Sequence, residues 1–180
     1  MAMALELAVR GEGRVSPNPL VGTVVVKSGR VVGSGWHQGP GCPHAEVEAL
    51  ARAGGRARGA DLYVTLEPCC HQGRTAPCTG AILRAGVRRV FAAMEDPEPR
   101  MRGRGFAALR RGGVRGRVGL GRPQAAQMNE SYVLTRTLGR AFLHLKLAVT
   151  QDLKIAPRRG RHVMLSGHES LVRAHELRAG

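Results

Sequence analysis

The sequence predicts an α/β fold, in which helices pack on a layered sheet. Short apolar segments, several of them rich in valine, alternate along the chain with segments of helical character. This alternation is typical of a layered α/β sheet. Apolar residues make up 43% of the 180 residues, which is enough to build a hydrophobic core in a chain of this length.

Several short apolar segments are expected to be strands. The first two are separated by the turn Ser28-Gly29, so together they form a hairpin. The later ones each follow a helical segment and a glycine, as strands of an α/β sheet do. The expected strands cover residues 20–27, 30–35, 61–66, 88–94 and 114–118.

Helical segments lie between and around these strands. Glycine follows directly after the segments that end at residues 10, 53 and 85, and glycine is a common residue just past the end of a helix. Prolines at positions 17 and 19 exclude regular structure in the first loop. The expected helices cover residues 2–10, 44–53, 78–85, 104–111 and 124–137, and a strand-like segment at 142–149 precedes a last helix at 165–179.

The charge and the composition limit the partners of the chain. The formal net charge is +15, and a basic surface binds polyanions without specificity. A surface that stacks bases also needs aromatic side chains among the basic ones, but aromatic residues make up only 3%. No apolar run approaches the roughly 18 residues that span a bilayer, and the first residues contain no basic leader. We therefore expect a soluble cytoplasmic protein with no membrane contact and no specific nucleic-acid partner.

The cysteines gather in one part of the chain, together with histidines. In a cytoplasmic protein such a cluster indicates metal or redox chemistry rather than disulfides. One histidine and two cysteines make a zinc site with an open fourth position, which is the catalytic pattern, and His44, Cys69 and Cys78 are the candidates. Cys42 is the main rival because it lies two residues from His44, and Cys70 is expected not to be a ligand.

Glu46 is the candidate catalytic residue. It lies two residues after His44, so on an ideal helix its side chain points away from the histidine, and we expect it to carry protons rather than to bind metal. Zinc nucleobase deaminases have the pattern H-x-E followed by P-C-x-x-C. Here the second half is Pro68-Cys69 followed by Pro77-Cys78, with eight residues between the two cysteines.

In these motifs the chain resembles the bifunctional deaminase-reductases of riboflavin biosynthesis. The resemblance implies a three-layer α/β/α cytidine-deaminase-like sandwich with a central mixed sheet, formed by a zinc-dependent pyrimidine deaminase domain at residues 1–140. Residues 141–180 resemble the truncated start of a reductase domain, so reductase activity is not expected. The matching segments are residues 16–22, 35–37, 44–47, 64–69, 71–78, 96–97 and 103–105.

The resemblance also implies a reaction. It is the hydrolytic deamination of 2,5-diamino-6-(5-phosphoribosylamino)pyrimidin-4(3H)-one to 5-amino-6-(5-phosphoribosylamino)uracil and ammonia, with Zn²⁺ as cofactor. By motif position, zinc is bound by His44, Cys69 and Cys78, and Glu46 transfers protons. The residues implied to contact this phosphoribosylated aminopyrimidine are Asn18, His37, His71, Arg74 and Glu98.

Glu98 departs from the family pattern, which usually has asparagine there. A carboxylate at this position repels a phosphorylated sugar unless arginines such as Arg74, Arg100 or Arg102 neutralise it. Two alternatives to the implied function stay open: a nucleotide or tRNA deaminase of the same superfamily, and an inactive remnant stabilised by zinc. The oligomeric state is open as well, with a homo-oligomer as one option.

Overall fold

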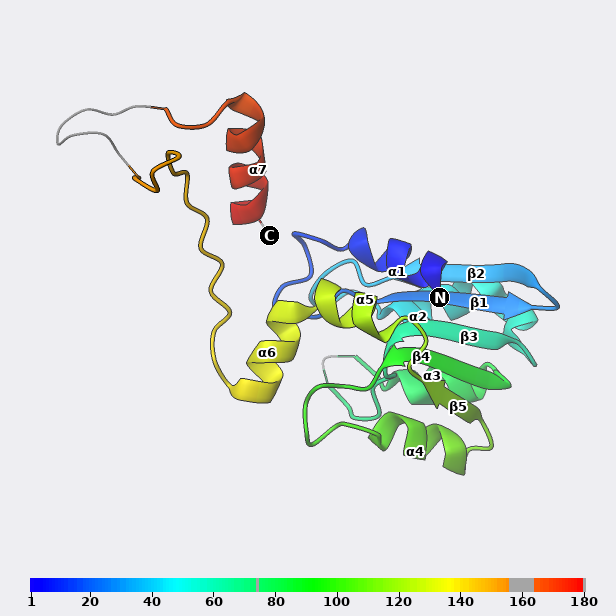
Figure 1. The fold of residues 1–180 in the computed structure, drawn as a ribbon. Helices are drawn as coiled ribbons and strands as arrows, with labels where there is room; N and C mark the ends of the chain where they lie inside the picture. Colours follow the sequence, from blue (N-terminus) through cyan, green and yellow to red (C-terminus); the bar gives the residue numbers. More distant parts are fainter. Residues whose placement is uncertain (74, 156–163, 180) are drawn as a thin grey trace. The chain divides into compact units, whose positions relative to one another are not determined.

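A computed structural model of the chain describes residues 1–73, 75–155 and 164–179. The chain divides into two compact units, Met1–Ala141 and Phe142–Gly180. The first unit contains a five-stranded sheet with helices on both of its faces (Figure 1). None of the helices in the described ranges is long and apolar enough to cross a membrane.

The sheet is mixed, as expected. β1 lies between β2 and β3 and is antiparallel to both, which makes β1 and β2 the predicted hairpin. β3, β4 and β5 run parallel to one another. In the order in which they lie side by side, the strands are β2 (Arg30–Trp36), β1 (Gly22–Lys27), β3 (Asp61–Leu66), β4 (Arg89–Met94) and β5 (Arg115–Val118).

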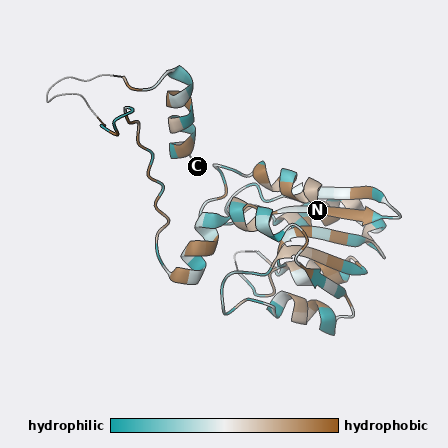
Figure 2. Ribbon diagram, viewed as in Figure 1, coloured by the Kyte–Doolittle hydropathy of each residue, from teal (hydrophilic) through white to brown (hydrophobic). Residues whose placement is uncertain are grey.

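Helices cover one face of the sheet and form the larger core. Apolar side chains of α2, α3 and α4 pack there against alternate residues of β3 and β4, such as Leu62, Val64 and Val90, which are fully buried. Hydrophobic residues recur along these central strands in Figure 2. The helices are α2 (Ala45–Ala53), α3 (Cys78–Arg84) and α4 (Arg104–Arg111), and a short 3-10 turn, η1 (Gly54–Ala57), follows α2.

The other face carries two smaller apolar clusters. Ala4 and Leu7 of α1 (Ala2–Val9) pack against Val24 of β1. Ala125 of α5 (Arg122–Met128) packs against Ala93 of β4. The three layers that result confirm the predicted class.

The predicted helix over residues 124–137 is in fact two helices, α5 and α6 (Glu130–Leu138), which meet at Asn129. The side chain of Asn129 is buried and accepts a hydrogen bond from the Leu20 N–H at 2.7 Å, while its amide donates to the Leu20 carbonyl at 3.0 Å. Its backbone, at φ −109° and ψ 27°, is not helical. A long-range side-chain contact therefore interrupts a segment whose local pattern is continuous.

The second unit differs from expectation at residues 142–149. We predicted a strand there, but the structure assigns none, and the apolar side chains are exposed, with Leu143 at 84% and Leu145 at 71%. A strand is stable only when another strand satisfies its backbone groups, and within the described residues this segment pairs with none. The predicted last helix is present as α7 (His168–Ala179) and begins three residues later than expected.

Candidate active site

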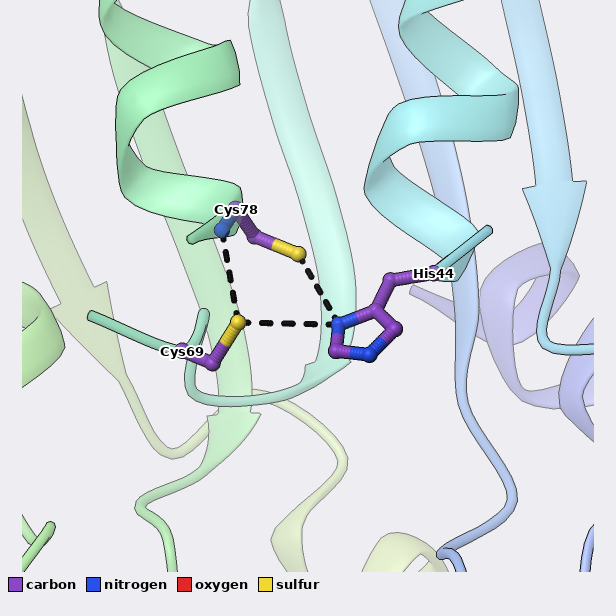
Figure 3. Close-up of side chains that lie close together, drawn as sticks. All are labelled: His44, Cys69 and Cys78. Carbon is purple, nitrogen blue, oxygen red and sulfur yellow. Dashed lines mark hydrogen bonds between the residues drawn. The ribbon is translucent and has the colours of Figure 1, made fainter. Parts of the chain in front are cut away.

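Three side chains from separate elements converge at one end of the sheet. His44 is the N-cap of α2, Cys78 is the first residue of α3, and Cys69 lies in the loop after β3. Figure 3 shows the three side chains pointing toward one another. Nδ1 of His44 lies 3.1 Å from Sγ of Cys78 and 3.5 Å from Sγ of Cys69, and the three candidate ligand atoms all lie within 4.8 Å of one another.

The side chains of Cys69 and Cys78 interact directly. The Cys78 thiol donates a hydrogen bond to Cys69, and mainly for this reason the pKa of Cys69 is lowered to about 4. The same bond, together with burial, raises the pKa of Cys78. The backbone N–H of Cys78 also donates to Sγ of Cys69 at 3.3 Å. A metal that binds both sulfurs takes them as thiolates and displaces the protons of the thiols.

Thr75 fixes the orientation of the His44 ring. Its Oγ1 lies 3.1 Å from Nε2 of His44. When Nδ1 binds a metal, the proton of the neutral ring is on Nε2, which then donates to Thr75 Oγ1. Ligand histidines in metal sites are usually held by such a second hydrogen bond. Thr75 could not be predicted from the sequence, since no residue spacing distinguishes a hydroxyl in an irregular loop.

These three side chains fit Zn²⁺. One nitrogen and two sulfur donors match the preferences of zinc, and three protein ligands leave a fourth position for water or substrate. Among the described residues, this is the one group of metal-binding side chains that lies close enough together. Cys42 and Cys70, which we expected not to be ligands, are outside it. The predicted cofactor is therefore supported by the chemistry of the donor set.

Glu46 lies in the first turn of α2 and is 4% exposed. It lines the cavity beside the metal-binding cluster but does not belong to the cluster. Burial raises the pKa of Glu46 to about 7, and the charge of Cys69 adds to the effect. A dication nearby favours the carboxylate. A carboxyl group whose pKa lies near neutrality is suited to accept a proton in one step and to return it in the next.

The cavity beside the cluster has a volume of about 520 Å³, which is within the range of small-molecule sites. Four of the predicted substrate contacts line it: Asn18, His37, His71 and Glu98. The fifth, Arg74, lies outside the described residues. Residues from motifs that are far apart along the chain therefore line the same cavity.

Asn18 and His37 form a hydrogen-bonded pair on one wall. Nδ2 of Asn18 donates to Nε2 of His37 at 3.0 Å, and Nδ1 of His37 donates to the Pro43 carbonyl at 3.4 Å. Burial is the main cause that lowers the pKa of His37, which agrees with a neutral ring that accepts at Nε2. The pair leaves Oδ1 of Asn18 as an acceptor.

Glu98 forms an ion pair with Arg136, which was not among the predicted site residues. Oε2 of Glu98 lies 3.9 Å from Nη1 of Arg136 in α6. The guanidinium of Arg136 also lies 5.3 Å from the ring centre of Tyr132, and both residues line the cavity. In the described part of the chain, neither Arg100 nor Arg102 forms an ion pair with Glu98, and Arg136 does so instead. Arg136 lies 38 positions after Glu98, and local spacing contains no signal for such a contact.

The fold and the cavity together define a class of protein. A His/Cys/Cys cluster, with His44 and Cys78 at helix starts, and a buried glutamate two residues after the histidine are the features of the zinc-dependent nucleobase deaminases. Residues 1–94 match the family model described as "Cytidine and deoxycytidylate deaminase zinc-binding region". The chain belongs to this family.

Within the family, the chain is similar to proteins of riboflavin biosynthesis. It is 48% identical to the riboflavin biosynthesis protein RibD of Aquifex aeolicus over 99% of this chain and 50% of the relative. The solved structure of Acinetobacter baumannii RibD superposes with a TM-score of 0.96 at 39% identity, over 99% of this chain and 50% of that chain.

A third relative has a more specific description. The structure of a diaminohydroxyphosphoribosylaminopyrimidine deaminase/5-amino-6-(5-phosphoribosylamino)uracil reductase from Thermotoga maritima has a TM-score of 0.90 at 40% identity. The match covers 99% of this chain and 51% of that chain. This chain therefore spans about half the length of the relatives that it matches.

Proposed function

We propose that this chain removes an amino group from 2,5-diamino-6-(5-phosphoribosylamino)pyrimidin-4(3H)-one by hydrolysis, in riboflavin biosynthesis. The products are 5-amino-6-(5-phosphoribosylamino)uracil and ammonia. The observation that carries the proposal is the buried carboxyl group of Glu46 beside the His44, Cys69 and Cys78 cluster, in a cavity of about 520 Å³. The similarity to the Thermotoga maritima protein supports the choice of substrate.

The roles of the residues follow from their chemistry. Zinc in such a site lowers the pKa of a bound water to about 7 and so supplies a nucleophile at neutral pH. The carboxylate of Glu46 accepts the proton of the attacking water and then gives it to the leaving amino group. Each role needs a different protonation state of Glu46, and the buried position of its side chain beside the cluster puts it where the proton is exchanged.

The walls of the cavity bind the substrate. Oδ1 of Asn18 accepts a hydrogen bond from the pyrimidine, because its Nδ2 is already bonded to His37. We assign the phosphoribosyl part to the region of Glu98 and Arg136, which lie 3.9 Å apart and both line the cavity. Arg136 is the one arginine or lysine among the described residues that line this cavity, and guanidinium groups bind phosphate well. Arg74 stays a predicted contact on the basis of the family motif.

The variant Glu46→Gln tests the proposal. The amide keeps the shape of the side chain but cannot transfer a proton, so zinc content and substrate binding should persist while kcat falls by roughly 10² to 10⁴. Glu48→Gln is the matched control, because Glu48 is on the same helix but pairs with Arg52 at 3.0 Å. It should retain the rate of the unmodified chain. A Glu46→Gln variant with a near-normal rate would reject Glu46 as the proton carrier.

Two broader predictions accompany this function. A homo-oligomer is one option for the assembly of the chain, and we infer that the chain resides in the cytoplasm. Analytical ultracentrifugation checks the first, because a single species at the mass of one chain contradicts it. Cell fractionation checks the second, and recovery with the membrane fraction contradicts it.

A further inference from the structure

Glu67 is a buried carboxylate that the proposed chemistry does not use. It directly follows β3 and is 5% exposed. Its Oε2 accepts hydrogen bonds from the N–H groups of Asp96 at 3.1 Å and Gly103 at 2.9 Å. Its Oε1 accepts from the N–H groups of Gly105 at 2.8 Å and Phe106 at 3.3 Å. One side chain thus satisfies four backbone groups that are far away in the sequence.

The two bonds to Oε2 hold both ends of one loop. Asp96 and Gly103 bracket the segment between β4 and α4, and Asp96, Glu98 and Met101 from this segment line the cavity. Oε2 of Glu67 therefore bonds to both ends of the loop that lines this part of the cavity. Hydrogen bonds to a charged acceptor are the stronger kind, so the loop is held firmly.

The two bonds to Oε1 cap a helix from outside it. The N-cap of α4 is Gly103, which has no side chain to bond the free N–H groups of the first turn. A helix start leaves such groups unpaired unless another element supplies an acceptor. Glu67 supplies it to Gly105 and Phe106. The position of α4, and of the loop before it, therefore depends on a residue at the end of β3.

The backbones at this junction lie in close contact. A Cβ atom placed on Gly105 would lie 2.1 Å from the Pro68 carbonyl oxygen, so only glycine fits. The Glu67 N–H donates to the Met94 carbonyl at 3.0 Å. Cys69, a member of the metal-binding cluster, follows two residues later. The same short segment thus connects the cluster to the cavity wall.

We propose that Glu67 is a positioning residue, which sets the distance between the cavity wall at residues 96–103 and the metal-binding cluster. Through this wall it controls how tightly the substrate binds, while the chemical step stays with Glu46. The inference rests on the proposed function for its kinetic consequence. Its structural part, the anchoring of the loop and of α4, is independent of the substrate.

The test compares Glu67→Gln and Glu67→Asp with Glu95→Gln in the full chain loaded with zinc. The amide of glutamine removes one of the two acceptor oxygens, and aspartate shortens the reach while it keeps the charge. Glu95 is exposed and lies just before the same loop, so its variant controls for the loss of one negative charge. Zinc content, KM and kcat with the diaminopyrimidine phosphate, and amide hydrogen exchange at residues 96, 103, 105 and 106 are measured for each.

For both Glu67 variants we expect one zinc per chain and a kcat within about threefold of that of the unmodified chain. The KM should rise about tenfold, because the loss corresponds to about one hydrogen bond to a charged group. Hydrogen exchange at the four amides should accelerate in both Glu67 variants. Glu95→Gln should change neither the KM nor the exchange at these amides.

Three results would overturn the inference: an unchanged KM, a fall in kcat alone, or loss of the fold or of zinc in both variants. If the unmodified chain does not deaminate this substrate, the proposed function fails, while faster exchange at the four amides still supports the anchoring role.

Discussion

The ion pair between Glu98 and Arg136 contributes to the charge that a phosphorylated substrate meets in the cavity. The two charged groups lie 3.9 Å apart, and their side chains are 31% and 46% exposed. At an effective dielectric constant near 20 the attraction is about 4 kcal/mol before screening. Exposed pairs of this kind retain only about 0.2 to 1 kcal/mol after solvation and side-chain entropy are included. Removal of the Glu98 carboxylate should therefore lower the free energy of unfolding only slightly. Its negative charge, however, repels a phosphate that approaches Arg136.

The variant Glu98→Asn should lower KM for the phosphorylated substrate about fivefold, equivalent to about 1 kcal/mol. It removes one negative charge from the cavity and leaves Arg136 free to bind the phosphate. High salt should reduce the gain, because mobile ions screen exposed charges. Steady-state kinetics with the phosphorylated substrate and with its dephosphorylated analogue measure the effect, and the analogue should show little change.

Glu95→Gln is the control for this experiment, because Glu95 is a nearby exposed acid that does not line the cavity. If it lowers KM as much as Glu98→Asn does, the effect comes from net charge and not from the ion pair. If Glu98→Asn instead raises KM, Glu98 assists binding by orienting Arg136, and the reasoning from charge repulsion is refuted.

Three further predictions concern the metal and the core. Cys69→Ala should lose zinc whereas Cys70→Ala should keep it, and metal analysis that shows full zinc in the first or none in the second would refute the ligand assignment. Asn129→Ala should lower the free energy of unfolding by about 2 kcal/mol, because both Leu20 backbone groups lose their partners; denaturant titration checks this, and an unchanged midpoint would contradict it. Leu62→Ala, at a fully buried position, should cost about 3 kcal/mol in the same titration, and a loss below about 1 kcal/mol would show that the core refills the space.

Local patterns predicted most of the secondary structure. Valine-rich segments between glycine turns are strands, and the strands and helices of the first unit lie within a few residues of the expected bounds. The predictions were wrong where contacts between residues far apart in the sequence determine the secondary structure. Asn129 interrupts a helix because Leu20 needs its side chain, and residues 142–149 form no strand because nothing in the described part of the chain pairs with them.

The candidate site followed the same rule. His44, Cys69 and Cys78 were visible in the sequence because metal ligands occur in fixed motifs, and the structure brings them together. Glu67 and Arg136 could not be identified from the sequence, because their partners lie 29 or more positions away. Glutamate and arginine are also common on protein surfaces. Chemistry that depends on a motif can be predicted from sequence, whereas the residues that shape the cavity need the fold.

Ammonia release by the zinc-loaded chain tests the proposed deamination directly. The phosphorylated diaminopyrimidine is compared with cytidine, dCMP and tRNA at equal concentrations, and Glu46→Gln serves as the inactive reference. We expect one ammonia from the diaminopyrimidine for each uracil product formed, and far slower release from the other three. No ammonia from this substrate, or faster release from cytidine, dCMP or tRNA, would contradict the proposed deamination.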